Sequence, residues 1–371
     1  MKRILIAIIT LLLLLGVYFK FSEKDTIKIG LIGGLSGKYS ELGHSLLNGV
    51  NLALDEVNFE IDGKKVEIIS KDDRQKSTFA KLAVEEFKRE KIDLIIGSGT
   101  SSMTKVVLES MDEVYNPILF SPSASSSFFS KKDDNFLRTQ VSQSVDSFHQ
   151  LTKYLVSNSK KNIYAIYDSR NAAYSESYAY NFEKSLIKNG GNPLVQLREI
   201  SKDFSFIVED IKKIKNVDTV IIIANPIDTA KLSQFLRINN INQTIVGSSW
   251  SKSSKLLEDG GKYIEGMIFL TSYDNSSKNK NYLDFIKKYE SKYKVTPSIY
   301  ASQSYETGKI IIESLKKNSN LKEFKQTLLS IKKFKGLQGD IEFDKYGDVK
   351  REHLLMVVKD NNYIVIENRN F

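Results

Sequence analysis

Residues 117–126, PILFSPSASS, and residues 92–105, IDLIIGSGTSSMTK, decide how the rest of the chain is interpreted. Each is a short apolar run that stops in small polar residues, a pattern typical of a buried strand in a parallel sheet. In open parallel sheets, ligands bind just past the carboxyl ends of the strands. Here those ends carry uncharged hydrogen-bond donors: Ser98, Thr100, Ser101, Ser102, Ser121, Ser123, Ser125 and Ser126.

A helix predicted after the first of these segments supports the same interpretation. Thr100 or Ser101 would cap a helix that runs to about residue 115. The free N–H groups at a helix N-terminus favour an anion. We therefore expect an anion-binding pair of loops; the alternative is two loops with ordinary capping serines.

The composition excludes several classes of protein. The 371 residues, 41% of them hydrophobic, are enough for two or three domains with real cores. Cysteine is absent, which excludes disulfides, thiolate metal sites and a cysteine nucleophile. The three histidines, His44, His149 and His353, are far apart in the sequence and are expected at the surface. We expect no metal site and no cofactor.

The net charge of +9 does not indicate nucleic-acid binding. Beyond the first twenty residues the excess falls to +6, and the charges alternate along helical faces without a basic arm. We interpret them as a solvated surface.

The N-terminus predicts a signal anchor over residues 1–21. Lys2 and Arg3 precede an apolar run from residue 4 to 19 that is interrupted only by Thr10 and Gly16. This run is longer than most signal-peptide cores and slightly shorter than a span of about 20 residues. The following VYFKFSEK is a poor cleavage site, so we expect an uncleaved anchor with the rest exported; a removed signal peptide is the alternative.

From residue 26 onward, strand and helix patterns alternate regularly and then restart near residue 144. Strands such as 27–32, 92–97, 117–121 and 218–224 are separated by helices of 10 to 18 residues. This alternation predicts βαβ units and parallel sheets. Because no low-complexity linker separates the two halves, we expect an α/β protein with two Rossmann-like lobes joined by more than one crossing.

The motifs that might indicate an enzyme fail on inspection. The segment GGLSGK (33–38) lacks the phosphate-loop pattern, since Ile32 stands at the first glycine position and Tyr39 follows the lysine. GSGTSS (97–102) lacks the third glycine of a dinucleotide fingerprint, and no GxSxG elbow occurs. The sequence therefore predicts a binding protein and not an enzyme.

Several segments together resemble the type I periplasmic binding proteins of ABC transporters, specifically the branched-chain amino acid (Leu/Ile/Val) binding family. They are the segment at 27–58, KDD at 71–73, IIGSGTSS at 95–102, PILFSPSAS at 117–125, FLRTQVSQS at 136–144, YDSRNAAYSES at 167–177 and GDIEFDKYGD at 339–348. The resemblance covers about residues 26–355. It implies two lobes that close on a ligand, joined by three crossings near 137–141, 269–273 and 336–341. It divides the chain into lobe 1 (26–141 plus 273–336) and lobe 2 (142–272 plus 337–371).

The resemblance also implies the site. Ser101, Ser123, Ala124 and Ser125 are expected to hold a ligand carboxylate, and Tyr174 to close from the second lobe. Three positions depart from the amino acid binders, since Leu42 and Asn225 replace aromatics and Ser249, beside Trp250, replaces the acid that pairs with the ligand ammonium. Because an unpaired buried ammonium is costly, another acid is needed for such a ligand, and Asp168 or Asp228 is the alternative. Tyr300 completes the expected contacts.

The resulting hypothesis is an extracytoplasmic solute-binding protein. It would capture a small amino-acid-like, carboxylate or amide ligand and deliver it to an ABC permease at the bacterial cytoplasmic membrane, to which its N-terminal helix is expected to tether it. The alternative is a membrane-tethered sensor that presents its ligand state to a partner receptor or kinase. No nucleic-acid partner is expected.

Overall fold

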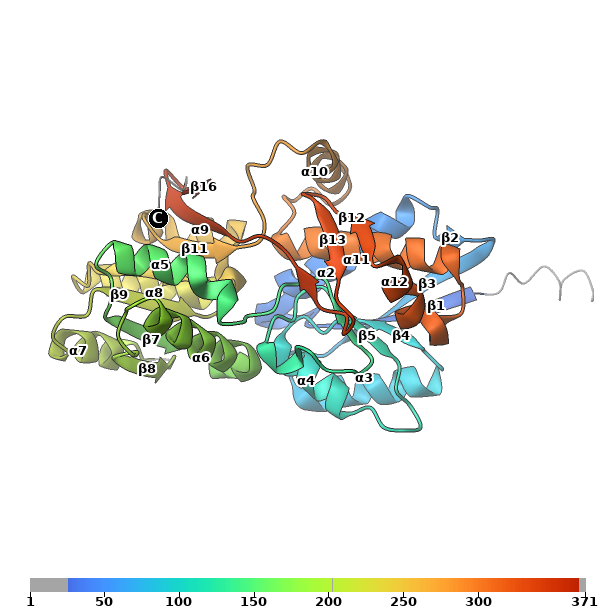
Figure 1. The fold of residues 1–371 in the computed structure, drawn as a ribbon, viewed down its shortest axis with the longest axis horizontal. Helices are drawn as coiled ribbons and strands as arrows, with labels where there is room; N and C mark the ends of the chain where they lie inside the picture. Colours follow the sequence, from blue (N-terminus) through green and yellow to red (C-terminus); the bar gives the residue numbers. More distant parts are fainter. Residues whose placement is uncertain (1–25, 202, 367–371) are drawn as a thin grey trace, which may run out of the picture.

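The computed structural model describes residues 26–201 and 203–366 as two α/β lobes lying side by side (Figure 1). The anchor expected at residues 1–21 lies outside these residues. Within the described ranges, no helix is both long and apolar enough to cross a membrane.

The first lobe is built on a six-stranded sheet in the order β2-β3-β1-β4-β5-β6. All neighbours are parallel except the β2–β3 hairpin, so the predicted βαβ units are confirmed. The elements of this part of the chain are β1 (Thr26–Gly33), α2 (Ser40–Asp55), β2 (Glu60–Ile61), β3 (Lys64–Asp72), α3 (Ser77–Arg89), β4 (Leu94–Ile96), α4 (Ser101–Glu109), β5 (Ile118–Ser121) and β6 (Phe136–Arg138).

The second lobe has a seven-stranded sheet in the order β16-β15-β11-β10-β9-β7-β8. Strands β7 to β11 are parallel, whereas β15 and β16 add an antiparallel edge. Its elements are α5 (His149–Ser157), β7 (Ile163–Tyr167), α6 (Ala172–Lys188), β8 (Gln196–Glu199), α7 (Ser205–Lys213), β9 (Thr219–Ile223), α8 (Pro226–Ile238), β10 (Thr244–Gly247), α9 (Ser254–Gly260), β11 (Ile268–Thr271), β15 (Leu354–Lys359) and β16 (Asn362–Val365).

Alternation along the strands explains why each sheet is covered on both faces. In the first lobe, Leu94 and Ile96 point into one core cluster while Ile95 between them points into another. The same division occurs in the second lobe, where Ile222 and Ile223 of β9 enter different clusters. Successive strand residues face opposite sides, so a strand buried on both sides is apolar throughout.

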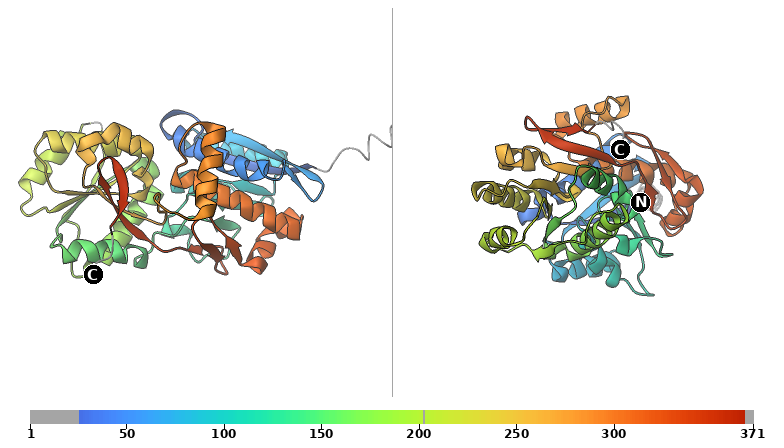
Figure 2. Two further views of the ribbon diagram at one scale, coloured as in Figure 1. Left: turned by 90° about the horizontal axis from the view of Figure 1, so that it is seen from above. Right: turned by 60° about the vertical axis from the view of Figure 1, so that its left-hand side comes forward.

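The third crossing differs from the expectation. Residues 333–350 form a three-stranded antiparallel sheet, and its Phe334, Ile341 and Phe343 lie in the first-lobe core with Phe120. The expected crossing at 336–341 therefore falls inside the first lobe. The C-terminal strands, red in Figure 2, leave this lobe after β14 and reach the second sheet at β15.

The elements that carry the chain through this region are mostly helical. Helix α11 is almost entirely buried and packs in the first-lobe core. The bounds are α10 (Lys280–Tyr293), α11 (Ile299–Lys317), α12 (Phe324–Ile331), β12 (Lys333–Lys335), β13 (Asp340–Phe343) and β14 (Val349–Lys350).

Helix α4 is shorter than expected, ending at Glu109 instead of near residue 115. The carboxylate of Asp112 accepts hydrogen bonds from the backbone N–H groups of Val114 (2.8 Å) and Tyr115 (2.7 Å). Aspartate side chains that bond nearby backbone groups in this way compete with the helix.

Candidate ligand-binding cleft

Two serine loops, residues 97–102 and 121–126, meet at the carboxyl ends of β4 and β5. The hydroxyl of Ser123 donates to the carbonyl oxygen of Gly99 at 2.9 Å. The hydroxyl of Ser121 accepts from the N–H of Ala124 at 3.0 Å. These bonds use the hydroxyls inside the loops and hold the two loops together.

The start of α4 is also occupied. Thr100, and not Ser101, is the cap, because its hydroxyl accepts from the N–H of Met103. The preceding amide, that of Ser102, donates to the side-chain oxygen of Asn171 in the second lobe at 3.0 Å. In this arrangement an asparagine from the opposite lobe occupies one of the N–H groups that were expected to attract an anion.

The serine loops rest on a buried arginine that the sequence interpretation missed. Arg138 at the end of β6 is 0% exposed. Its guanidinium donates to the carbonyl oxygen of Ser126 (2.9 Å), the hydroxyl of Ser130 (2.7 Å) and the carboxylate of Asp348 (2.7 Å). Arg138 therefore ties the second loop to the segment that precedes the third crossing.

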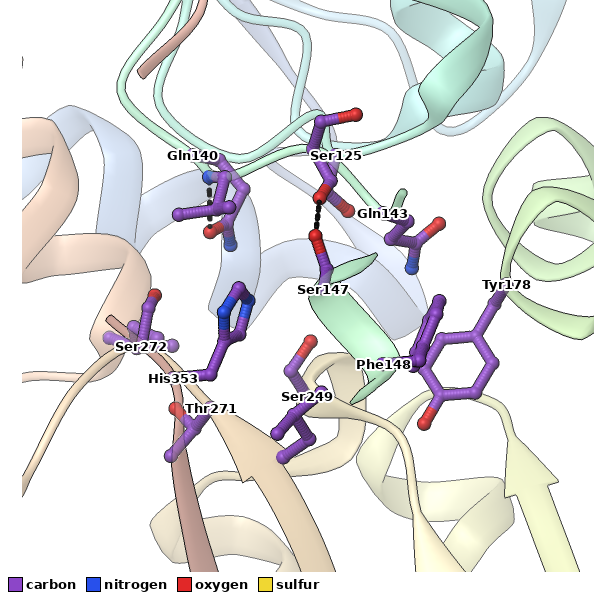
Figure 3. Close-up of a pocket in the computed structure, with 14 residues that line it drawn as sticks. Ser125, Gln140, Gln143, Ser147, Phe148, Tyr178, Ser249, Thr271, Ser272 and His353 are labelled. Carbon is purple, nitrogen blue, oxygen red and sulfur yellow. Dashed lines mark hydrogen bonds between the residues drawn. The ribbon is translucent and has the colours of Figure 1, made fainter. Parts of the chain in front are cut away.

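The cleft between the lobes contains two small cavities. The first, which we call the hinge-side cavity, measures about 40 Å³ and is shown in Figure 3. All three crossings contribute to it, through Gln140 and Gln143, Thr271 and Ser272, and His353. The lobes add Ser125, Ser147, Phe148, Tyr178, Ser249 and Ile299.

Polar groups in the hinge-side cavity lack partners. Neither side-chain amide atom of Gln143 makes a hydrogen bond with the described residues, nor does the hydroxyl of Tyr178, although all three atoms are buried. Buried polar groups are normally hydrogen-bonded, so unpartnered ones in a cavity mark a place for a polar ligand. Ser125 is the one residue of the expected carboxylate set that lines this cavity; Ser101, Ser123 and Ala124 are buried behind it.

His353 was expected at the surface, and the structure corrects this. It lines the hinge-side cavity, and burial lowers its pKa to about 4. His44 and His149 are exposed, as expected.

The second cavity, which we call the aromatic cavity, measures about 30 Å³. The ring of Tyr39 stacks on that of Trp250 with 6.1 Å between centroids, and Tyr174 packs edge-on against Trp250. The lining also includes Lys38, Glu41, Leu42, Asn225, Ser298 and Tyr300.

Four expected site residues meet at this point. The hydroxyl of Tyr174 accepts from the N–H of Trp250 (3.3 Å) and lies 3.4 Å from the hydroxyl of Ser249. Tyr300 reaches the carbonyl oxygen of Ser249 at 3.5 Å. Burial raises the pKa of Tyr174, which keeps its hydroxyl protonated and able to donate.

The first-lobe aromatic was expected to be missing, because Leu42 stands at its position. The structure supplies Tyr39 instead, three residues earlier in the loop after β1. The segment GKYSEL showed an aromatic in that loop, but only the fold places its ring against Trp250.

The acids proposed for a ligand ammonium are already paired. Asp168, 1% exposed, receives two bonds from Arg170, at 2.7 and 2.8 Å. Asp228 receives both Lys38, at 2.6 and 2.7 Å, and Arg170. Despite burial, these partners hold the pKa of Asp228 below its usual range. We call Lys38, Asp168, Arg170 and Asp228 the charged cluster.

Asn225 belongs to this cluster rather than to an open ligand surface. It caps α8 by accepting from the N–H of Asp228, and its amide donates to the carboxylates of Asp228 (2.7 Å) and Asp168 (3.3 Å). The amide thus braces the two acids where the resemblance implied an aromatic contact.

A sequence model of the family described as "Periplasmic binding protein" matches residues 26–362 of this chain. The Leu/Ile/Val-binding protein BraC3 of Rhizobium johnstonii is 27% identical over 253 residues, which is 67% of this chain and 68% of that protein.

Solved structures share the fold. The leucine-binding protein LivK of Thermotoga maritima superimposes with a TM-score of 0.81 at 20% identity, covering 92% of this chain and 98% of that one. LivJ of Streptococcus pneumoniae in complex with isoleucine superimposes with a TM-score of 0.81 at 21% identity, covering 92% of this chain and 99% of that one. A solute-binding protein of R. palustris in complex with benzoate superimposes with a TM-score of 0.82 at 17% identity, covering 92% of this chain and 96% of that one.

Proposed function

Because this chain belongs to the periplasmic binding protein family, we propose that it captures a small carboxylate or amide solute between its lobes and delivers it to an ABC permease. It is a solute-binding protein and not an enzyme, because the family model, its relatives and the structures that share its fold are all of binding proteins. The resemblance found in the sequence is thus confirmed at the level of the family.

The observation that supports the ligand class is the set of neutral polar groups in the hinge-side cavity. Among the described residues, the side-chain amide of Gln143 and the hydroxyl of Tyr178 have no hydrogen-bond partner, and Ser125 and Ser249 line the same cavity. A carboxylate or amide can use such donors without a cation, since several neutral hydrogen bonds can stabilise an anion. In this proposal Ser125 and Ser249 contact the ligand, while Ser101, Ser123 and Ala124 hold the loop in place.

The contacts between the lobes favour closure around a ligand. The N–H of Ala173 donates to the hydroxyl of Ser102 (3.1 Å), and Asn181 donates to the hydroxyl of Ser127 (2.9 Å). A ligand that touches both lobes stabilises this arrangement, because it binds the closed state better than the open one. The packing supports lobe 1 as 26–141 plus 273–350 and lobe 2 as 142–272 plus 354–366.

A thermal-shift screen tests the function. Small carboxylates, amides, amino acids and sugars, with isoleucine and benzoate among them, are added to the purified protein, and hits are measured by calorimetry. We expect a carboxylate or amide to raise the melting temperature and small-angle scattering to show compaction. Saturating binding with an unchanged radius of gyration would contradict closure, and stabilisation by sugars alone would contradict the ligand class.

The location follows from the family and the sequence together. We propose that the protein works on the outer side of the cytoplasmic membrane and that residues 1–21 tether it there, because the segment after the apolar run is a poor cleavage site. Full-length protein should remain in the membrane fraction. A mature N-terminus between residues 19 and 26 in a soluble extract would contradict the tether.

A further inference from the structure

The charged cluster contains two buried acids on the second-lobe side of the cleft, and each already has a cation. Arg170 holds Asp168 through two parallel bonds and also reaches Asp228. Asp228 has a second cation in Lys38, whose ammonium touches both carboxylate oxygens. Two carboxylates thus face two cations, and the cluster is electrically neutral.

Lys38 differs from Arg170 because it comes from the opposite lobe. It lies in the loop between β1 and α2, next to Tyr39, whose ring stacks on Trp250 of the second lobe. Its ammonium therefore crosses the cleft to Asp228, an acid in the first turn of α8. An amino acid ligand would need to place its own ammonium against a buried acid of this kind.

Resting on the proposed function, we propose that Lys38 is a tethered ammonium that occupies Asp228, an acid that a ligand ammonium would need, so that the site takes carboxylate solutes without an α-ammonium. A side chain attached to the same protein competes at an effective concentration in the millimolar range. A free amine must displace it, and the displaced lysine then loses its partner.

The remaining charges of the two cavities do not offer a substitute. Of the described residues, those that line the hinge-side cavity include no acid, lysine or arginine. The aromatic cavity has one further acid, Glu41, which is exposed and faces Lys255, Glu258 and Asp259 of α9. An ammonium inside the closed cleft would thus lack a buried counter-charge.

Matched pairs of ligands test this inference. Isoleucine is compared with 3-methylpentanoate, and phenylalanine with 3-phenylpropanoate, by titration calorimetry on the parent protein. The two members of each pair differ only in the α-ammonium. We expect the amine-free acid to bind at least about tenfold more tightly in at least one pair.

Variants identify the residue responsible. In Lys38→Met the acid Asp228 keeps Arg170 but loses its second cation, so it can accept a ligand ammonium and the preference should shrink by about tenfold or reverse. Lys81→Met removes an exposed lysine of α3 with the same change of charge and should keep the parent preference. Lys38→Gln serves if the methionine variant is poorly folded.

Each other result overturns the inference in a distinguishable way. If the parent binds the amino acid more tightly, the amine position is open and the inference is wrong, while the carboxylate proposal stands. If Glu41→Gln then abolishes that binding, the ammonium belongs to Glu41. If the parent binds neither member of either pair but binds another class of solute, the proposed ligand class fails and the inference fails with it.

Discussion

The two faces of the cleft are held in place by different means. The first-lobe face consists of the serine loops, which are bonded to each other and to Arg138 within their own lobe. The second-lobe face carries rings and the charged cluster, and one member of that cluster, Lys38, comes from the other lobe. The first face is therefore formed whether the lobes are open or closed, whereas the second is complete only when they meet.

Removal of Arg138 should have the largest effect, because the first-lobe face depends on it. Arg138→Met leaves the carboxylate of Asp348 and the carbonyl oxygen of Ser126 without their buried donor, so we expect the free energy of unfolding to fall by about 3–5 kcal/mol. Urea denaturation measures this. Arg74→Met, a change at an arginine whose side chain is 57% exposed, is the control. A loss of unfolding free energy smaller than that of Arg74→Met would show that the serine loops are stable without Arg138.

The next effect concerns His353, at the crossing between the faces. Its folded pKa of about 4 lies below the ordinary histidine value of 6.5, so between these values the unfolded chain binds more protons. Stability should therefore rise with pH across this window, by about 2–3 kcal/mol from this group.

Comparison of the parent with His353→Gln isolates the contribution of His353 to the pH dependence of stability. We expect the variant to show a smaller increase in unfolding free energy from pH 4 to 6.5, measured by urea denaturation at several pH values. Asp73, whose pKa burial raises to about 6, titrates in both proteins and cancels. Equal pH slopes would show that His353 is solvated in the folded state. His149→Gln, at an exposed position, is the control.

Ser125 and Ser126 sharpen the comparison within one loop. Ser125→Ala should weaken binding of the carboxylate found by the screen about ten- to a hundred-fold, since a hydrogen bond to a charged group contributes about 1.5–3 kcal/mol. Ser126 instead accepts from the N–H of Phe128, and Ser126→Ala should cost about 1 kcal/mol of stability with unchanged affinity. Calorimetry and urea denaturation distinguish the two. Equal affinities in both variants would place the carboxylate elsewhere.

Lys38→Met should have the smallest effect on unfolding, about 1 kcal/mol or less. The lysine side chain is 31% exposed, and Asp228 keeps Arg170 and Asn225 as partners. The change should appear instead as a larger radius of gyration in scattering, because one contact between the lobes is lost. A loss of several kcal/mol would show that the second face depends on Lys38 for folding.

Local patterns made most of the fold predictable. The alternation of strands and helices, and the hydroxyls at the ends of β4 and β5, follow from short runs of sequence, and the structure has both. The positions of the serines relative to the hinge-side cavity were not predictable. Ser125 lines the cavity while the hydroxyl of Ser123 bonds to Gly99, and this difference depends on the conformation of the turn and not on the residue type.

The charged cluster could not be predicted for a different reason. Lys38 and Asp228 are 190 residues apart, and nothing near either residue indicates the other. The same holds for residues 333–350, whose apolar strands fit either lobe by pattern and are assigned only by packing against Phe120. Periodicity shows that a segment is buried, but it does not show against what.

The return of the chain to the first lobe also affects how the protein is made. The first-lobe sheet is synthesised early, yet α11 and β13, which cover one of its faces, come after the whole of α5 to β11. Until they emerge, an apolar surface built from β1, β4 and β5 stays open to other nascent chains and to chaperones. The usual order of N-terminal domain first does not hold here, because the lobe that begins the chain is completed only after α5 to β11 of the second lobe, and β15 and β16 then complete the second lobe.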